Sequence, residues 1–266
     1  MSAPAGQQEA DGPNIARVYD CLLGGSHNFA ADRAAAGEFL ARWPDAAETM
    51  RLNRAFLGRA VRFLAADAGI RQFLDVGSGI PTMGNVHAIA QQEAPDARVV
   101  YVDNDDVAVL HSRAILARND NAIAIQADLR HPREILADQQ LRNLLDLTQP
   151  TALLLVAVLH FFPDADHPAA SVAHLRDALA PGSYVVISHG TTDDQPPHVA
   201  AAMEHYNQTT APFRPRTHAE VDAFFDGLEL IDPGLVHVPL WRPDQPENAG
   251  EHPERIAAYG GVGRKR

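Results

Sequence analysis

Three acidic residues stand at or just after short apolar segments, where the strands of a parallel sheet would bring their side chains together. These residues are Asp75, Asp103 and Asp128. Ligands of open parallel sheets bind beyond the carboxyl ends of the strands, so side chains at these positions share one edge. Carboxylates crowded there without basic residues repel one another unless the ligand brings positive charge or many hydrogen-bond donors. The pattern therefore predicts a binding site for a cation.

A glycine-containing loop follows the first of these acids and reads Asp75-Val76-Gly77-Ser78-Gly79-Ile80-Pro81. Gly77 and Gly79, with Ser78 between them, permit a sharp turn, and the absence of a Cβ lets backbone N–H groups approach a ligand. The alternative is a tight strand-to-helix turn that binds nothing.

The second acid lies about 20 residues after the glycine loop, where nucleotide-binding sites hold the two hydroxyl groups of a ribose. Asp103 is followed by Asn104 and Asp105. An acid here can instead cap the next helix, so one of Asp103 and Asp105 could bind the ribose while the other caps the helix. The third acid, Asp128, precedes Leu129 and on its own is compatible with a turn or a helix N-cap.

The loop sequence distinguishes two kinds of nucleotide. A nicotinamide or flavin dinucleotide carries a pyrophosphate, which favours the spacing G-x-G-x-x-G. Here Gly79 and Gly84 are separated by four residues, with Pro81 between them. S-adenosylmethionine has a ribose, an adenine, an ammonium and a sulfonium but no phosphate, and it fits the acidic edge better. An NAD(P)-binding oxidoreductase and a non-catalytic regulatory protein that binds S-adenosylmethionine remain the alternatives.

Two histidines follow later strand-like segments and are candidates for a catalytic base. His160 and His189 would titrate near neutral pH and could take a proton from a hydroxyl acceptor. Either could instead be a packing or loop residue. No histidines show the spacing H-E-x-x-H, and no serine has the flanking glycines of G-x-S-x-G, so a zinc hydrolase and a serine hydrolase are not expected. No metal site is predicted.

The elements that would position these residues alternate regularly after residue 71. Strand-like apolar segments and helix-like amphipathic segments follow one another, which predicts right-handed βαβ crossovers and a mostly parallel sheet covered on both faces. The predicted strands are 72–76, 98–102, 122–126, 152–157 and 183–188, and the helices between them are 84–93, 105–117, 132–137 and 168–179. Residues 152–159 are apolar throughout, as in a central strand buried on both faces.

The ends of the chain follow other patterns. Residues 1–12 are polar and small and read as a disordered tail. Helical spacing of apolar residues runs through 14–66, and Gly24-Gly25 is expected to end its first helix. After residue 188 the sequence predicts helices at 199–206 and 217–225, the second with a capping box, and two final antiparallel strands at 228–231 and 259–262.

Composition limits the partners and the compartment. The 266 residues carry a net charge of −12, which disfavours a nucleic acid as partner or substrate. The single cysteine, Cys21, cannot form an internal disulfide, and no segment reads as a signal peptide or a membrane span, so a cytoplasmic protein is expected and a membrane partner is not. The oligomeric state cannot be read from the sequence.

The chain as a whole resembles class I S-adenosylmethionine-dependent methyltransferases, and in particular an actinobacterial group long described as a domain of unknown function. The group's N-terminal motif is close to Y-D-x-L-L-G-G-x-x-N-F. The matching segments here are 19–29 (YDCLLGGSHNF), 53–57 (NRAFL), 73–79 (FLDVGSG), 100–105 (VYVDND), 127–130 (ADLR), 158–161 (VLHF), 180–184 (APGSY) and 259–263 (YGGVG). The resemblance therefore spans nearly the whole chain.

The resemblance implies a Rossmann-like fold and places the cofactor S-adenosyl-L-methionine in the acidic edge. It puts Asp75, Gly77 and Gly79 around the methionine end, Asp103 at the ribose, and Asp128 with Leu129 beside the adenine. It also implies that the segment beginning at Ala157 closes over the cofactor. The loop lacks the third closely spaced glycine of many methyltransferases, so contacts beyond Gly79 are not implied.

The cofactor's carboxylate would also need a cationic partner. Arg17, one turn before Cys21, is the candidate, with Gly24 and Gly25 letting the chain pass close; a solvated helix residue is the alternative. We therefore expect a seven-stranded α/β methyltransferase domain over 69–266, preceded by a helical cap segment over 13–68. The expected reaction is methyl transfer to a small molecule, whose pocket could include Tyr19, Phe29, Trp43, Tyr206 and Phe213, although such aromatics are more often core.

Overall fold

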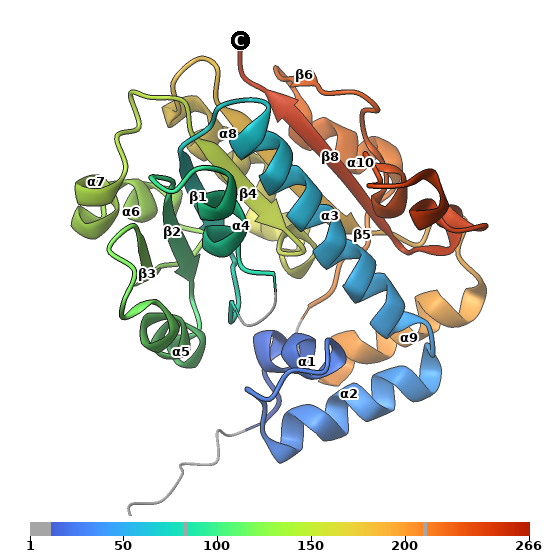
Figure 1. Ribbon diagram of the computed structural model, residues 1–266. Coiled ribbons are helices and arrows are strands. Elements are labelled where there is room, and N and C mark those ends of the chain that lie inside the picture. Colours follow the sequence, from blue (N-terminus) through green and yellow to red (C-terminus); the bar gives the residue numbers. More distant parts are fainter. Residues whose placement is uncertain (1–11, 82–83, 210–211) are drawn as a thin grey trace, which may run out of the picture.

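The alternating apolar segments form one mixed sheet in the computed structural model, which describes residues 12–81, 84–209 and 212–266 (Figure 1). The strands are β1 (Gln72–Val76), β2 (Arg98–Asp103), β3 (Ala122–Gln126), β4 (Ala152–Val156), β5 (Tyr184–Gly190), β6 (Glu229–Leu230), β7 (Val236–His237) and β8 (Ala258–Arg264). Their order is β3-β2-β1-β4-β5-β8-β6, and β7 also pairs with β8. β4 is therefore central, as its unbroken apolar sequence predicts.

The sheet is parallel from β3 to β5 and antiparallel beyond. β8 runs antiparallel to β5, and both β6 and β7 pair with β8. The seven-stranded expectation is corrected to eight strands, because two short segments share the position beyond β8. The strand predicted at 228–231 contains β6, whereas β7 has only two residues and no apolar pattern of its own.

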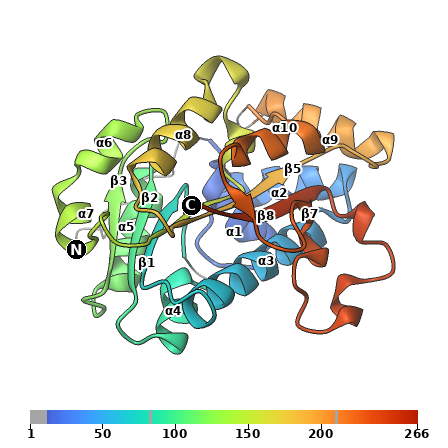
Figure 2. The same ribbon diagram turned by 90° about the horizontal axis from the view of Figure 1, so that it is seen from above.

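Helices cover both faces of the sheet (Figure 2). They are α1 (Ile15–Leu22), α2 (Ala30–Arg42), α3 (Ala46–Ala66), α4 (Val86–Glu93), α5 (Asp106–Leu116), α6 (Pro132–Ala137), α7 (Gln139–Leu144), α8 (Pro168–Ala178), α9 (Pro197–Thr209) and α10 (His218–Asp222). One core cluster joins α3, α4 and α5 to the sheet, and a second joins α6, α7, α8 and α10 to the opposite face. Alternate strand residues, such as Phe73 and Leu74, contribute to opposite clusters.

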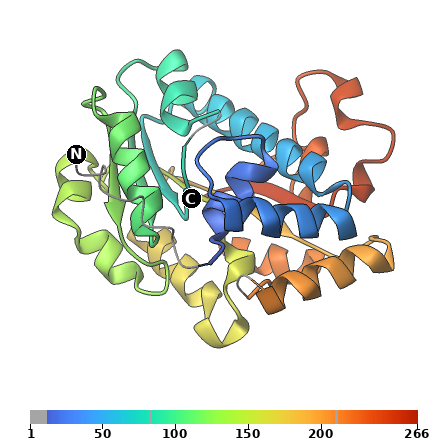
Figure 3. The ribbon, with the colours of Figure 1, turned by 90° about the horizontal axis from the view of Figure 1, so that it is seen from below.

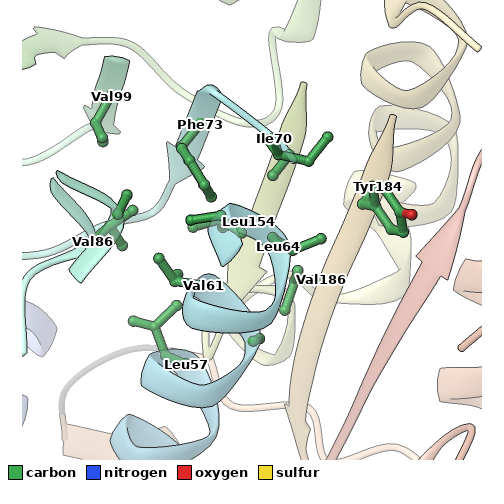
Figure 4. Packing of buried hydrophobic residues seen from close by; sticks show 14 of the residues in the cluster. Leu57, Val61, Leu64, Ile70, Phe73, Val86, Val99, Leu154, Tyr184 and Val186 are labelled. Atoms are coloured by element: carbon green, nitrogen blue, oxygen red, sulfur yellow. The ribbon is translucent and has the colours of Figure 1, made fainter. Parts of the chain in front are cut away.

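The long helix α3 is part of the main core. Its buried side chains Leu57, Val61 and Leu64 pack towards sheet residues such as Phe73 and Leu154 (Figure 4). Within the predicted N-terminal segment 13–68, α3 thus packs on a sheet face, and only α1 and α2 lie across the strand ends. The boundary at residue 68 stays a prediction.

A third cluster lies at the carboxyl ends of the parallel strands, where α1, α2 and α9 come together (Figures 1 and 3). Its members include Val18 of α1, Phe39 of α2 and Met203 of α9. α1 begins after its N-cap Asn14, whose side chain accepts hydrogen bonds from two backbone N–H groups, and it ends before Gly24, where φ is +80°. The helix thus ends where the glycine pair predicts.

The predicted tail at residues 1–12 lies outside the described residues except for Gly12. Within the described part of the chain, no helix combines the length and apolar character needed to cross a lipid bilayer.

Candidate active site

The carboxyl ends of β1 to β4 open into a cleft of about 1490 Å³, including space open to solvent. The structure brings together here most of the residues predicted to bind the cofactor. The predicted residues that line the cleft are Asp75, Gly77, Ser78, Gly79, Asp103, Asn104, Asp128, Leu129 and Ala157. Arg17 and Gly24 are not among its lining residues.

The glycine loop between β1 and α4 is held in a turn that requires glycine. Gly77 has φ +72° and Gly79 has φ +61°, both in the left-handed region. The Gly77 N–H donates to the Val102 carbonyl at 2.8 Å, which ties the loop to β2. A Cβ on Gly77 would lie 2.2 Å from Cγ2 of Val158, so the loop also depends on close packing.

Asp103 at the end of β2 is fixed by backbone groups. One carboxylate oxygen accepts the Gly79 N–H at 2.7 Å, and the other accepts the Asp105 N–H at 3.0 Å. Burial raises the pKa of Asp103 above its usual value, although these hydrogen bonds oppose the shift. Asp105 caps α5 by accepting the Val107 N–H at 2.8 Å, so the capping alternative applies to Asp105.

Asp75 and Arg54 both line the cleft and carry opposite charges when Asp75 is ionised. Burial raises the pKa of Asp75 to about 7, the charge of Arg54 acts to lower it, and the charge of Asp103 acts to raise it. Nε of Arg54 is buried and has no hydrogen-bond partner among the described residues. A buried guanidinium nitrogen without such a partner is unusual, which makes Arg54 a candidate ligand-binding residue.

Arg54 is a functional candidate that the pattern of strand ends did not reveal, because it lies on α3, ahead of the sheet in the sequence. The signal that could have found it is Asn53-Arg54, a polar pair within the apolar run of a helix. A second cation, Arg130, lies beside Asp128, with guanidinium-to-carboxylate distances of 2.6 and 3.0 Å. The expectation of an acidic edge without basic residues is therefore corrected.

The ion pair with Arg130 also keeps Asp128, which follows β3, in its ionised form. Burial acts to raise the pKa of Asp128, but the hydrogen bonds and charge of Arg130 lower it overall. Asp128 is thus ionised and largely neutralised by its own neighbour, while Asp75 and Asp103 have no such adjacent partner on their strands.

Arg17 is not among the residues that line the cleft, and it already has an acidic partner. Its Nε donates to Asp32 at 2.8 Å in a buried ion pair, and its guanidinium lies 5.3 Å from the ring centroid of Phe29. Asp32 also accepts the backbone N–H groups of Asn14 and Phe29, at 2.9 and 2.8 Å. Arg17 therefore joins α1 to the start of α2, and Gly24 is an exposed turn residue. Neither position favours the expected contact with the cofactor.

A second, inner pocket lies beside the cleft, with about 660 Å³ of empty space including solvent. Five residues line both cavities and form a shared wall between them: Ile15, Tyr19, Asn53, Ala157 and Phe161. Of the aromatics expected at an acceptor pocket, Tyr19, Trp43, Tyr206 and Phe213 line the inner pocket, whereas Phe29 does not.

A chain of hydrogen bonds that the sequence did not predict runs along this shared wall. The Tyr19 hydroxyl accepts from the Asn53 amide at 3.1 Å, and the Ser188 hydroxyl donates to the Asn53 carbonyl oxygen at 2.6 Å. Ser188 in turn accepts the Ala157 N–H at 3.0 Å. Ala157 has φ +56°, a strained value for a non-glycine residue, and these bonds help to hold it there.

Both candidate histidines line the inner pocket, but neither offers a free lone pair. Nδ1 of His160 accepts the Gly190 N–H at 3.2 Å, so the proton of the neutral ring is on Nε2. Nδ1 of His189 donates to the Gly190 carbonyl at 2.8 Å, and its Nε2 accepts from Arg216 at 3.0 Å. Burial lowers the pKa of His160 well below its usual value and that of His189 to about 3. The geometry thus opposes the expected role of either as a general base.

The next feature is the arrangement of potential metal ligands. Within 12–81, 84–209 and 212–266, the structure contains no group of three or more His, Cys, Asp or Glu side chains placed to hold an ion.

Comparison with known proteins identifies the class. The chain matches the S-adenosyl methyltransferase family over residues 2–266 and belongs to that family. A DUF574 family protein from Streptomyces avermitilis is similar over 98% of this chain and 100% of its own, with 42% identity and a TM-score of 0.93. A provisionally assigned methyltransferase from Thermobifida fusca is 41% identical over 97% of both chains, with a TM-score of 0.92.

More distant likeness concerns the fold alone. The N-methyltransferase NodS of Bradyrhizobium japonicum, solved with S-adenosyl-L-homocysteine, shares 12% identity at a TM-score of 0.52, over 94% of this chain and 98% of its own. No curated protein gives a significant match. The protein is an S-adenosylmethionine-dependent methyltransferase with a Rossmann-like fold, and the oxidoreductase and non-catalytic alternatives are set aside.

Proposed function

We propose that the cleft at the carboxyl ends of β1 to β4 holds S-adenosyl-L-methionine, with the Arg54–Asp75 pair receiving its amino acid end. This proposal is supported by two groups on the cleft wall. The buried Nε of Arg54 has no hydrogen-bond partner among the described residues, and burial raises the pKa of the Asp75 carboxyl to about 7. The amino acid end of the cofactor is a zwitterion, and it supplies a carboxylate for Arg54 and an ammonium for Asp75. Arg54 thereby takes the role that the sequence suggested for Arg17.

The other lining residues complete the assignment. Asp103 accepts the ribose hydroxyls, since its carboxylate oxygens are already oriented by backbone N–H groups and keep free lone pairs. Asn104, Asp128 and Leu129 flank the adenine, and the glycine loop with Ser78 presents backbone along the cofactor. Ala157, held in its strained conformation, lies where the cleft meets the inner pocket.

When bound, the cofactor supplies a methyl group already activated by its positively charged sulfur. The protein must then bind the acceptor, orient it and exclude water from it next to that methyl group. We assign neither His160 nor His189 the role of base, because their lone pairs are used by Gly190 and Arg216. Their rings instead pack and orient the wall of the inner pocket.

The acceptor we propose is a small molecule, not a nucleic acid. Support comes from the net charge of −12, which repels polyanions, and from the mainly apolar lining of the inner pocket, which offers a phosphate no counter-charge. We also propose a cytoplasmic location, because the single cysteine, Cys21, is a free thiol.

Calorimetric titration with S-adenosyl-L-homocysteine tests the assignment. We expect stoichiometric binding to the wild type and about 10- to 100-fold weaker binding to Asp103→Asn, since hydrogen bonds to a charged group contribute about 1.5–3 kcal/mol. NADH should not bind. Equal affinity in wild type and Asp103→Asn would remove Asp103 from the ribose site, and binding of NADH alone would overturn the proposal.

A further inference from the structure

The inner pocket is built without charge. It extends from the shared wall at Tyr19 towards α2 and α9, and among the described residues that line it none is Asp, Glu, Lys or Arg. Its two histidines have pKa values pushed below the usual range by burial, so both rings are neutral at pH 7. The remaining wall is mainly aromatic and aliphatic, and it includes Phe39, Trp43, Tyr206 and Phe213. A charged ligand group would lose its hydration here without gaining a counter-ion.

One polar atom in this wall lacks a partner. Thr49 on α3 is 3% exposed, and its Oγ1 is the single buried polar atom among the lining residues that makes no hydrogen bond within the described chain. The neighbouring polar side chains Tyr19, Asn53 and Ser188 are occupied with one another. A buried hydroxyl without a partner is costly. The Thr49 Oγ1 has almost no surface open to the pocket. Because helical threonine adopts either of two χ1 rotamers, a rotation about χ1 brings the hydroxyl to a ligand atom, and the hydrogen bond removes that cost.

The position of the pocket connects it to the cofactor cleft. Tyr19 and Asn53 line both cavities, and the next residue along α3, Arg54, lies on the cleft wall. A molecule in the inner pocket is therefore next to the end of the cleft that we assign to the methionine part of the cofactor.

We propose that the inner pocket binds the methyl acceptor, and that this acceptor is an uncharged, mainly apolar, aromatic-type molecule with a hydrogen-bonding atom that meets the Thr49 hydroxyl. The acceptor role rests on the proposed function of the cleft, whereas the chemistry of the ligand rests on the pocket alone. The absence of a free imidazole lone pair further selects acceptors whose reacting atom is nucleophilic without a base from the protein.

The first test uses N-phenyl-1-naphthylamine, an uncharged probe that becomes fluorescent in apolar cavities. We expect saturable binding, with energy transfer from Trp43, which lines the pocket, and a large loss of that transfer in Trp43→Phe. Trp241, in a different core cluster, serves as the internal comparison. Saturating S-adenosyl-L-homocysteine should leave the probe bound, because the two cavities are adjacent and distinct.

The second test displaces this probe with three molecules of similar shape: naphthalene, quinoline and 1-naphthoate. Quinoline adds a hydrogen-bond acceptor to naphthalene, so it should displace the probe at about fivefold lower concentration from the wild type, the effect of a single hydrogen bond. Thr49→Val, which replaces the hydroxyl with a methyl group, should abolish that preference. Thr49→Ser keeps the hydroxyl and should retain it. The anion 1-naphthoate should be at least about tenfold weaker than quinoline.

Each outcome decides the inference. A quinoline preference that is present in wild type and Thr49→Ser but lost in a folded Thr49→Val supports it. Absence of probe binding, an equal preference in all three proteins, efficient displacement by 1-naphthoate, or displacement by S-adenosyl-L-homocysteine overturns it. If the pocket results hold while S-adenosyl-L-homocysteine fails to bind, the proposed function of the cleft fails and the ligand chemistry of the pocket stands.

Discussion

At the scale of single residues, the proposed cofactor site depends most on Asp75 and Arg54. Both line the cleft, and each is incompletely matched in the protein itself: the carboxyl is buried enough to raise its pKa to about 7, and the guanidinium Nε has no partner among the described residues. Sites that are poised for a ligand show this kind of mismatch, because the ligand completes the pairing.

The raised pKa of Asp75 predicts pH-dependent cofactor binding. An ammonium is held by the carboxylate and not by the carboxylic acid, so affinity for S-adenosyl-L-homocysteine should rise about tenfold from pH 6 to pH 8, as a group with a pKa of about 7 ionises. Titrations across this range measure the slope. Asp75→Asn should bind weakly with a flat profile, and an unchanged slope in that variant would assign the titration to another group, such as Asp103.

The same shift has a consequence for stability. The folded pKa of Asp75 lies above the unfolded value of 3.8, so between pH 4 and pH 7 the folded state retains a proton that the unfolded state has released. This residue's contribution to stability therefore falls as pH rises through that window. The difference in melting temperature between Asp75→Asn and wild type should move in favour of the variant from pH 4 to pH 7; a constant difference would contradict the shifted pKa.

Two arginines form a matched pair for mutation. Arg54→Met should weaken S-adenosyl-L-homocysteine binding about 10- to 100-fold, the range for one lost charged hydrogen bond, while leaving 5′-methylthioadenosine, which lacks the amino acid end, nearly unaffected. Arg17→Met leaves Asp32 buried without its partner and should lower the free energy of unfolding by about 3–5 kcal/mol. Calorimetry and chemical denaturation separate the two effects. Equal losses for both adenosine ligands in Arg54→Met would contradict the assignment.

At the scale of elements, the glycine loop after β1 fixes the cleft's shape. Gly77→Ala combines a left-handed φ with a Cβ 2.2 Å from Val158, whereas a Cβ at Gly79 would meet only the Ala16 side chain at 3.8 Å. Gly77→Ala should therefore cost clearly more in melting temperature than Gly79→Ala. Thermal unfolding of both variants checks this order, and a larger effect at Gly79 would show that the loop is not limited by packing on Val158.

The sequence predicted elements well where pattern and burial agree. The strand at 122–126 has the same limits as β3, and the capping box at Thr217 is present at the start of α10. It missed α7 and β7, which are short and carry too few residues for a period to appear. Element ends that depend on tertiary contacts cannot be read from local spacing.

The same limit applies to sequence reasoning about the candidate site. Asp103 and the glycine loop follow strands, and topology alone brings strand ends together. The choice between Arg17 and Arg54 depends on which arginine has a partner elsewhere in the fold, and Asp32, the partner of Arg17, is a tertiary contact. The tautomer of His160 likewise depends on a backbone N–H contributed by Gly190.

At the scale of the whole molecule, α1, α2 and α9 form a layer across the carboxyl ends of the sheet (Figure 3). Segments far apart in sequence thus share one cluster, and α1 contributes Ile15, Ala16 and Tyr19 to the wall of the cleft. Binding in the cleft should therefore stabilise this layer more than the helices on the far side of the sheet.

Hydrogen exchange measures that coupling. Addition of S-adenosyl-L-homocysteine should slow amide exchange in α1 and in the loop after β1, and leave α7, which does not line the cleft, nearly unchanged. Uniform protection across the chain would indicate only global stabilisation, and no protection in α1 would contradict its place in the cleft wall.

The most direct test of the central claim is a crystal structure of the protein grown with S-adenosyl-L-homocysteine. We expect the nucleoside in the cleft, with the ribose hydroxyls on Asp103, the carboxylate on Arg54 and the inner pocket still open beside it. An empty cleft, or a ligand whose carboxylate lies on Arg17 or whose ribose lies away from Asp103, would contradict it.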